Sequence, residues 1–198
     1  MGTVPAAGRR GAAVAASAGL SLAATLAAWA SLRWSQVFGW LALDRQALHA
    51  GELWRLWSAH LAHLDARHAT INLAALALLA LVAARMRCLR GLLLASALLM
   101  PAISLALLLA LPRLQWYVGL SGLLHAWVAW LLLQYGGRIA MAGLVLLTAK
   151  LVFEATLPGT IDASFPVVPQ AHVAGSVLGI ALASAAACLG RLRESRTR

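Results

Sequence analysis

Charged residues are scarce in this chain, and their scarcity excludes most classes of soluble protein. Only 11% of the residues are charged, 62% are hydrophobic, and the mean hydropathy is +0.83. A soluble domain of 198 residues must cover its core with a polar exterior, and this composition cannot supply one. The sequence therefore predicts a protein whose solvent is lipid, with residues 1–198 folded as a single membrane domain.

Cysteines are also few, and the excess of basic over acidic residues is large. Cys88 and Cys188 are the only cysteines, and the topology predicted below puts both on the cytoplasmic side, where no disulfide is expected. The net charge of +10 would suggest nucleic acid as the partner of a soluble protein, but no long basic stretch alternates with aromatic residues. Arginines at helix ends explain the charge better, because they orient membrane helices and meet anionic lipid headgroups. We therefore expect the lipid bilayer, and no nucleic acid, as a partner.

Six apolar segments are each close to the ~20 residues that cross ~30 Å of hydrocarbon. The first follows Arg9 and Arg10 and is long for a signal peptide, so we interpret it as an uncleaved span. The sequence predicts an all-α bundle of six transmembrane helices, with residues 1–12 and 190–198 as tails. The six predicted spans are residues 13–32, 67–86, 91–111, 118–135, 138–157 and 170–189.

The arginines also predict how these helices are oriented, because cytoplasmic loops carry an excess of basic residues. A cytoplasmic N-terminus puts ten arginines inside (Arg9, Arg10, Arg85, Arg87, Arg90, Arg138, Arg191, Arg193, Arg196 and Arg198) and five outside (Arg33, Arg45, Arg55, Arg67 and Arg113). Both termini are therefore predicted to be cytoplasmic.

The connection 33–66 is long and rich in tryptophan. An indole ring can lie among acyl chains while its N–H reaches water, so tryptophans gather at membrane interfaces. We expect a half-submerged loop with one or two short amphipathic helices. Its tryptophans are Trp34, Trp40, Trp54 and Trp57.

Polar side chains stand near the starts of three predicted spans. The second span begins with His68 and Asn72, the fourth with Ser121, and the sixth with His172. These three helices run in the same direction, from outside to inside, so their first residues share one depth near the outer face. Polar residues inside spans are costly and are functional candidates by default.

These residue types suit nucleophilic catalysis. A serine hydroxyl needs a neighbouring base, usually histidine, to remove its proton. Attack on a peptide carbonyl creates an oxyanion, which N–H donors stabilise. Gly175 and Gly179 lie on the same helix face as His172, so this helix can approach the helix of Ser121 backbone to backbone.

Four motifs together resemble the rhomboid family of intramembrane serine proteases, over about residues 51–180. The resemblance implies a six-helix rhomboid-like fold, Ser121 and His172 as catalytic dyad, and an oxyanion hole of His68, Asn72 and the Ser121 amide. It implies supporting or packing roles for the other motif residues. The motifs are Gly119-Leu120-Ser121-Gly122, His172 with Gly175 and Gly179, His63 with His68 and Asn72, and Trp54-Arg55.

One position departs from the usual rhomboid pattern. His125 stands where most members carry a tyrosine, four residues after the serine. Together with short loops and with Lys150 and Glu154 in the fifth span, this is similar to the rhombosortase branch. That branch implies a bacterial inner membrane, a site facing the periplasm, and protein substrates with a C-terminal Gly-Gly motif, an apolar helix and a basic tail. The resemblance implies no cofactor and no metal.

Several alternatives stay open. Ser121 and its glycines could serve helix packing alone, and His125 could compete with His172 as base. A metal-dependent protein could use His60, His63 and His68, although the sequence has no HExxH motif. A rhomboid with other substrates, or an inactive binding or chaperone module, would keep the fold. We expect Lys150 and Glu154, one turn apart, to neutralise each other.

Overall fold

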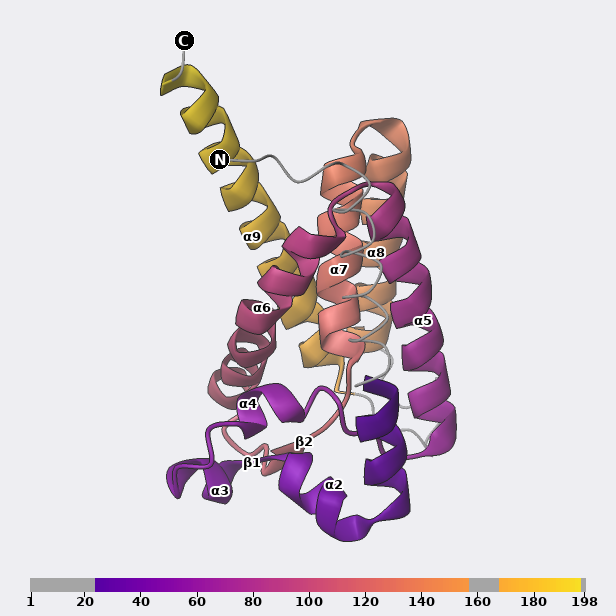
Figure 1. Cartoon of the computed structure of the whole chain (residues 1–198), viewed down its shortest axis with the longest axis vertical. Helices are drawn as coiled ribbons and strands as arrows, with labels where there is room; N and C mark the ends of the chain where they lie inside the picture. Colours follow the sequence, from indigo (N-terminus) through magenta and orange to yellow (C-terminus); the bar gives the residue numbers. More distant parts are fainter. Residues whose placement is uncertain (1–23, 157–167, 197–198) are drawn as a thin grey trace, which may run out of the picture. The chain divides into compact units, whose positions relative to one another are not determined.

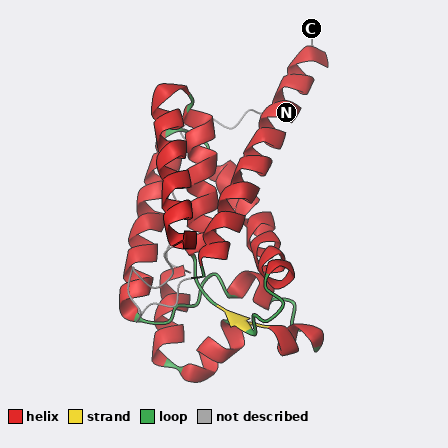
Figure 2. Cartoon of the chain, turned by 180° about the vertical axis from the view of Figure 1, so that it is seen from behind, coloured by secondary structure: helices red, strands yellow, loops and turns green. Residues whose placement is uncertain are grey.

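The described part of the chain is almost entirely helical (Figures 1 and 2). The computed structural model describes residues 24–156 and 168–196, and residues 24–33 form a helix that precedes α2. The elements that follow are α2 (Ser35–Leu41), β1 (Leu43–Asp44), α3 (Arg45–His49), α4 (Arg55–Ser58), α5 (Ala66–Arg85), α6 (Leu89–Ala110), β2 (Trp116–Tyr117), α7 (Ser121–Tyr135), α8 (Gly137–Thr156) and α9 (Pro169–Arg196).

Four predicted spans are confirmed as helices long and apolar enough to cross a bilayer. They are α5, α6, α8 and the Pro169–Leu189 part of α9. The first predicted span, 13–32, lies mostly outside the described residues. Helix α9 continues to Arg196, into the region predicted as a tail. The total of six spans and the orientation of the termini stay predictions.

The fourth predicted span, 118–135, is wrong at its start. Helix α7 has 15 residues and begins at Ser121, so it is ~22 Å long, shorter than the ~30 Å of hydrocarbon. The preceding residues are extended because β2 pairs antiparallel with β1, Leu43 opposite Tyr117. Gly119 then adopts φ 132°, which a helix excludes, and its N–H donates to the Ala59 carbonyl over 2.9 Å.

The chain forms two compact units, and the first comprises residues 1–98 and 113–120. Its connection between residues 33 and 66 holds three short helices rather than the expected one or two. Arg55 is buried there, where it pairs with Glu52 and donates to the carbonyls of Gly39 (2.6 Å) and Ala42 (2.7 Å). The four tryptophans of this connection are exposed, as an interfacial loop requires.

The second unit comprises residues 99–112 and 121–198, and helices α7, α8 and α9 pack together in it (Figure 1). Helix α7 is the most enclosed of the three, and its Trp127 is fully buried. Gly136 and Gly137 turn the chain from α7 into α8 with φ values of 71° and 70°, which side chains disfavour. The prediction that residues 1–198 form a single membrane domain stays a prediction.

The two cysteines provide a test of the predicted orientation. Cys88 and Cys188 are both predicted to lie on the cytoplasmic side. We therefore expect them to resist an impermeant maleimide in intact cells and to react in inverted membrane vesicles. Both thiols are without a disulfide. Burial raises the pKa of the Cys88 thiol, so Cys88 should label more slowly than Cys188. The measurement is mass-tag labelling of the single-cysteine variants. Labelling of either cysteine from outside would contradict the predicted orientation.

Candidate functional site

Ser121 is the first residue of α7, at the point where the extended segment turns into helix. Its side chain is half-buried, whereas Leu120 and Gly122 on either side are buried. The amides of a first helical turn have no intrahelical partner, and they carry the positive end of the helix dipole. Ser121 therefore lies where a negative charge would be stabilised.

Helices α7 and α9 approach each other backbone to backbone. A Cβ atom placed on Gly175 would overlap the Gly122 carbonyl, and one on Gly179 would overlap the Ala126 carbonyl. A Cβ atom on Gly122 would lie 3.0 Å from the Ala171 carbonyl oxygen. Gly122 directly follows Ser121, and Ala171 directly precedes His172, so the start of α7 abuts the start of α9.

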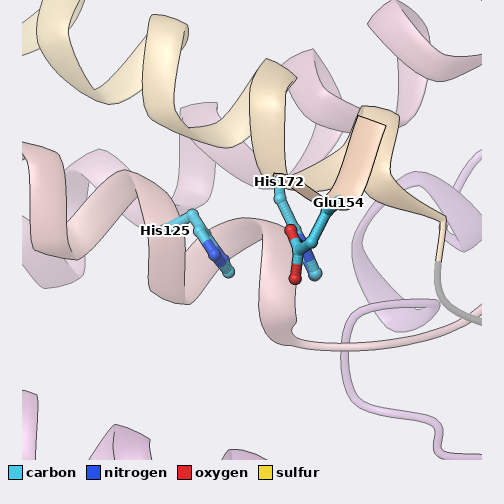
Figure 3. Close-up of side chains that lie close together, drawn as sticks. All are labelled: His125, Glu154 and His172. Carbon is cyan, nitrogen blue, oxygen red and sulfur yellow. The ribbon is translucent and has the colours of Figure 1, made fainter. Parts of the chain in front are cut away.

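The side chains of His172, His125 and Glu154 come from three helices and lie close together (Figure 3). His172 Nδ1 is 2.8 Å from Glu154 Oε2 on α8, and both residues are buried, at 5% and 8% exposure. The other carboxylate oxygen, Oε1, accepts from Lys150 Nζ over 2.6 Å. The expected pairing of Lys150 with Glu154 is therefore present, but His172 shares the carboxylate.

His125 stacks on His172, with ring centroids 4.0 Å apart and planes 13° from parallel. Its Nδ1 is 2.7 Å from the Ser121 carbonyl oxygen, and its Nε2 is 3.0 Å from Lys150 Nζ. A carbonyl only accepts and an ammonium only donates. Nδ1 of His125 therefore carries the proton, and Nε2 accepts from Lys150.

The same side chains have the composition of a metal site. Ligand atoms of His125, Glu154 and His172 all lie within 4.8 Å of one another, and zinc favours such donors. The ammonium of Lys150, however, donates to both His125 and Glu154. A cation would have to displace Lys150, so the arrangement fits a proton-handling group better than a metal centre.

His63, His68 and Asn72 belong to the first unit. Asp65 caps the start of α5, because its Oδ1 accepts from the His68 amide over 2.8 Å, and the rings of His63 and His68 lie 5.1 Å apart. Burial, and then the neighbouring His68, lower the pKa of His63 to about 4, so its ring is neutral at physiological pH. Asn72 is buried, and among the described residues no partner accepts from its Nδ2.

The other histidines and the Trp54-Arg55 pair have structural environments. His60 is fully buried against Tyr117, with ring centroids 5.8 Å apart, whereas His49 is exposed. Trp54 Nε1 donates to the Trp40 carbonyl over 3.3 Å. Trp54 and Arg55 therefore hold the connection 33–66 together through main-chain carbonyls.

The contact between Glu154 and His172 is the feature that the sequence analysis missed. The two residues are 18 positions apart and lie on different helices. The available signal was a carboxylate inside an apolar span, which needs a partner at membrane depth. Lys150, one turn away on the same helix, already meets that need, so the sequence does not identify the second partner.

The glycines of α9 can be tested directly. We expect Gly175→Ala to lower the free energy of unfolding by ~1–3 kcal/mol, because the new methyl group would overlap the Gly122 carbonyl. Gly91→Ala, on α6, is the matched control, since nothing lies within 4 Å of its added Cβ. Thermal unfolding in detergent measures both. Equal stability of the two variants would contradict the close approach of α7 and α9.

Comparison with known proteins adds one finding. The sequence model of the Rhomboid domain matches residues 50–187, which include every residue of the site described above. No curated protein matches the chain.

Proposed function

Because the chain belongs to the rhomboid family of intramembrane serine proteases, we propose that it cleaves membrane-anchored proteins with Ser121 as nucleophile and His172 as base. It is a multi-pass membrane protein, as its apolar helices and its family both require. The observation that carries the proposal is the close approach of α7 and α9 at Gly122 and Ala171. The chain neighbours of these two residues are the proposed nucleophile and the proposed base.

The surroundings of His125 favour His172 as the base. Both ring nitrogens of His125 are engaged, one with the Ser121 carbonyl and the other with Lys150. If His125 took a proton on Nε2, that N–H would face the ammonium of Lys150. Both groups can only donate, so the hydrogen bond between them would be lost. His125 instead supports the face of the His172 ring.

In the proposed reaction, Ser121 Oγ attacks the scissile carbonyl carbon and its proton passes to His172. The carbonyl oxygen becomes an oxyanion, which the Ser121 amide and the positive end of α7 can stabilise. Family motifs add His68 and Asn72 as donors. His172 then gives its proton to the leaving amine.

We expect Ser121→Ala and His172→Ala each to abolish cleavage of a rhomboid substrate, because each removes an atom of the proposed proton transfer. Ser121→Ala should leave the melting temperature nearly unchanged, whereas His172→Ala should lower it, because one oxygen of the buried Glu154 carboxylate loses its partner. His68→Ala and Asn72→Ala should lower the rate by ~10²–10³-fold, the usual effect of losing one oxyanion donor. The measurement is cleavage by the purified variants in liposomes. Normal turnover by Ser121→Ala or His172→Ala would exclude the dyad.

Control variants and reagents distinguish a serine protease from a metal-dependent protease and from an inactive module. Ser184→Ala and His49→Ala change exposed residues of the same types and should keep normal activity. Cleavage should persist in a chelator, whereas a metal-dependent protease would lose it. A fluorophosphonate should label the wild type and not Ser121→Ala, and an inactive binding or chaperone module would remain unlabelled.

The depth of Ser121 in the bilayer would limit where a substrate can be cut. With the Tyr135 end of α7 at the inner boundary, a helix of ~22 Å leaves Ser121 roughly 8 Å below the outer one. The scissile bond must therefore come from a membrane anchor, near its outer end. We propose the C-terminal anchors of bacterial surface or secreted proteins, met on the periplasmic side of the inner membrane. A Gly-Gly pair suits such a site, because glycine disfavours helix by ~1 kcal/mol relative to alanine.

A weak helix at a Gly-Gly pair predicts that substrates with this pair are cut preferentially. Co-expression with a reporter that carries Gly-Gly, an apolar helix and an Arg-rich tail should give cleavage near the glycines, and a Leu-Leu version should be cut at least several-fold less. Mass spectrometry of the new C-terminus locates the cut and distinguishes hydrolysis from transfer to an amine. Equal cleavage of both reporters would refute the role of glycine. Cleavage of a generic rhomboid substrate alone would favour an ordinary rhomboid with other substrates.

A further inference from the structure

A buried carboxylate within an apolar helix needs a physical reason to be there. Glu154 lies in the span α8 and is only 8% exposed. Ionisable groups at membrane depth are costly, so they are paired and usually serve function. Lys150 alone would neutralise the charge, yet the carboxylate also reaches a second helix and contacts His172.

The bond between Glu154 and His172 fixes which nitrogen of the imidazole is basic. A carboxylate accepts hydrogen bonds, so His172 Nδ1 carries the proton that faces Glu154 Oε2, 2.8 Å away. The lone pair of the neutral ring is then on Nε2. A base that takes the proton of a serine hydroxyl needs this tautomer.

We propose that Glu154 is a positioning residue that completes a Ser121-His172-Glu154 triad, which rests on the function proposed above. Glu154 holds His172 in the Nδ1–H tautomer and stabilises the imidazolium that forms when Ser121 attacks. Lys150 holds the carboxylate in turn, because its ammonium donates to the Oε1 atom that His172 does not use.

The proton and charge balance of the step is closed within these residues. As the bond from Ser121 Oγ to the substrate carbon forms, the O–H proton moves to His172 Nε2 and the carbonyl π electrons move to oxygen. One imidazolium and one oxyanion appear together. Glu154 remains a carboxylate throughout, and it faces the new positive charge at hydrogen-bonding distance in a water-poor site.

The stack of His125 on His172 restricts the ring further. Parallel rings 4.0 Å apart leave little room for His172 to tilt, and His125 is itself anchored at both nitrogens. His172 is therefore held at its edge by Glu154 and at its face by His125. Such preorganisation is what general-base catalysis requires of a side chain.

The test is Glu154→Gln, which keeps the size of the side chain but removes its charge. The glutamine amide can present N–H to His172 and so favour the wrong tautomer. We expect kcat to fall on the order of 10²–10⁴-fold, with KM changed less than threefold. Leu147→Ala is the matched control, because Leu147 is buried on the same helix and its truncation destabilises through packing alone. Its kcat should follow the folded fraction.

A second measurement reports the tautomer without any substrate. ¹⁵N NMR of imidazole-labelled protein should show His172 protonated at Nδ1 and hydrogen-bonded in the wild type, and a mixed tautomer in Glu154→Gln. Unchanged kcat in Glu154→Gln, or His172 protonated at Nε2 in the wild type, would overturn the inference. Normal cleavage by Ser121→Ala would overturn the proposed function instead, so the two failures are distinguishable.

Discussion

Helices α7 and α9 meet without side chains between them, Gly122 against Gly175 and Ala126 against Gly179. In lipid the hydrophobic effect does not hold helices together, so association depends on close packing and hydrogen bonds. Small residues allow that packing, because a side chain on Gly175 or Gly179 would overlap the backbone of α7. Because Gly122 follows Ser121 and Ala171 precedes His172, this packing also brings together the chain neighbours of the proposed nucleophile and the proposed base. Stability and the proposed chemistry therefore depend on the same contact.

The hydrogen-bonded group of His172, Glu154 and Lys150 depends in turn on the packing of α9. A buried carboxylate is tolerable in a span only when its oxygens are satisfied, and here Lys150 and His172 each bind one of them. Lys150 is about half exposed, at 47%, so the long side chain can keep part of its head solvated. The group therefore tolerates a charge that would be prohibitive for Glu154 alone, and His172 gains a fixed partner.

The spans and the glycine face of α9 could be predicted because both are local patterns. Apolar length identifies α5, α6, α8 and α9, and the spacing of Gly175 and Gly179 indicates a face for close packing. The start of α7 could not be predicted, because Val118 and Leu120 are apolar enough to continue a helix. The segment is extended because its neighbours Trp116, Tyr117 and Gly119 pair with distant residues. The contact of Glu154 with His172 is likewise tertiary, and no spacing rule within one helix reveals it.

The shortness of α7 connects this local structure to the proposed reaction. Gly119, with φ 132°, ends the extended segment just before Ser121, so α7 begins only at Ser121 and is shorter than the hydrocarbon layer of a bilayer. Under the proposed function, the substrate segment that meets Ser121 has left bulk water but has lost its helical hydrogen bonds. Helical peptide carbonyls are already engaged and shielded, whereas unwound ones need donors. The first-turn amides of α7 have no intrahelical partner, so they are donors of the kind that the proposed oxyanion needs. The β1–β2 pairing keeps the residues before Ser121 extended and so shortens α7, and the proposed cleavage of a membrane anchor rests on that short helix.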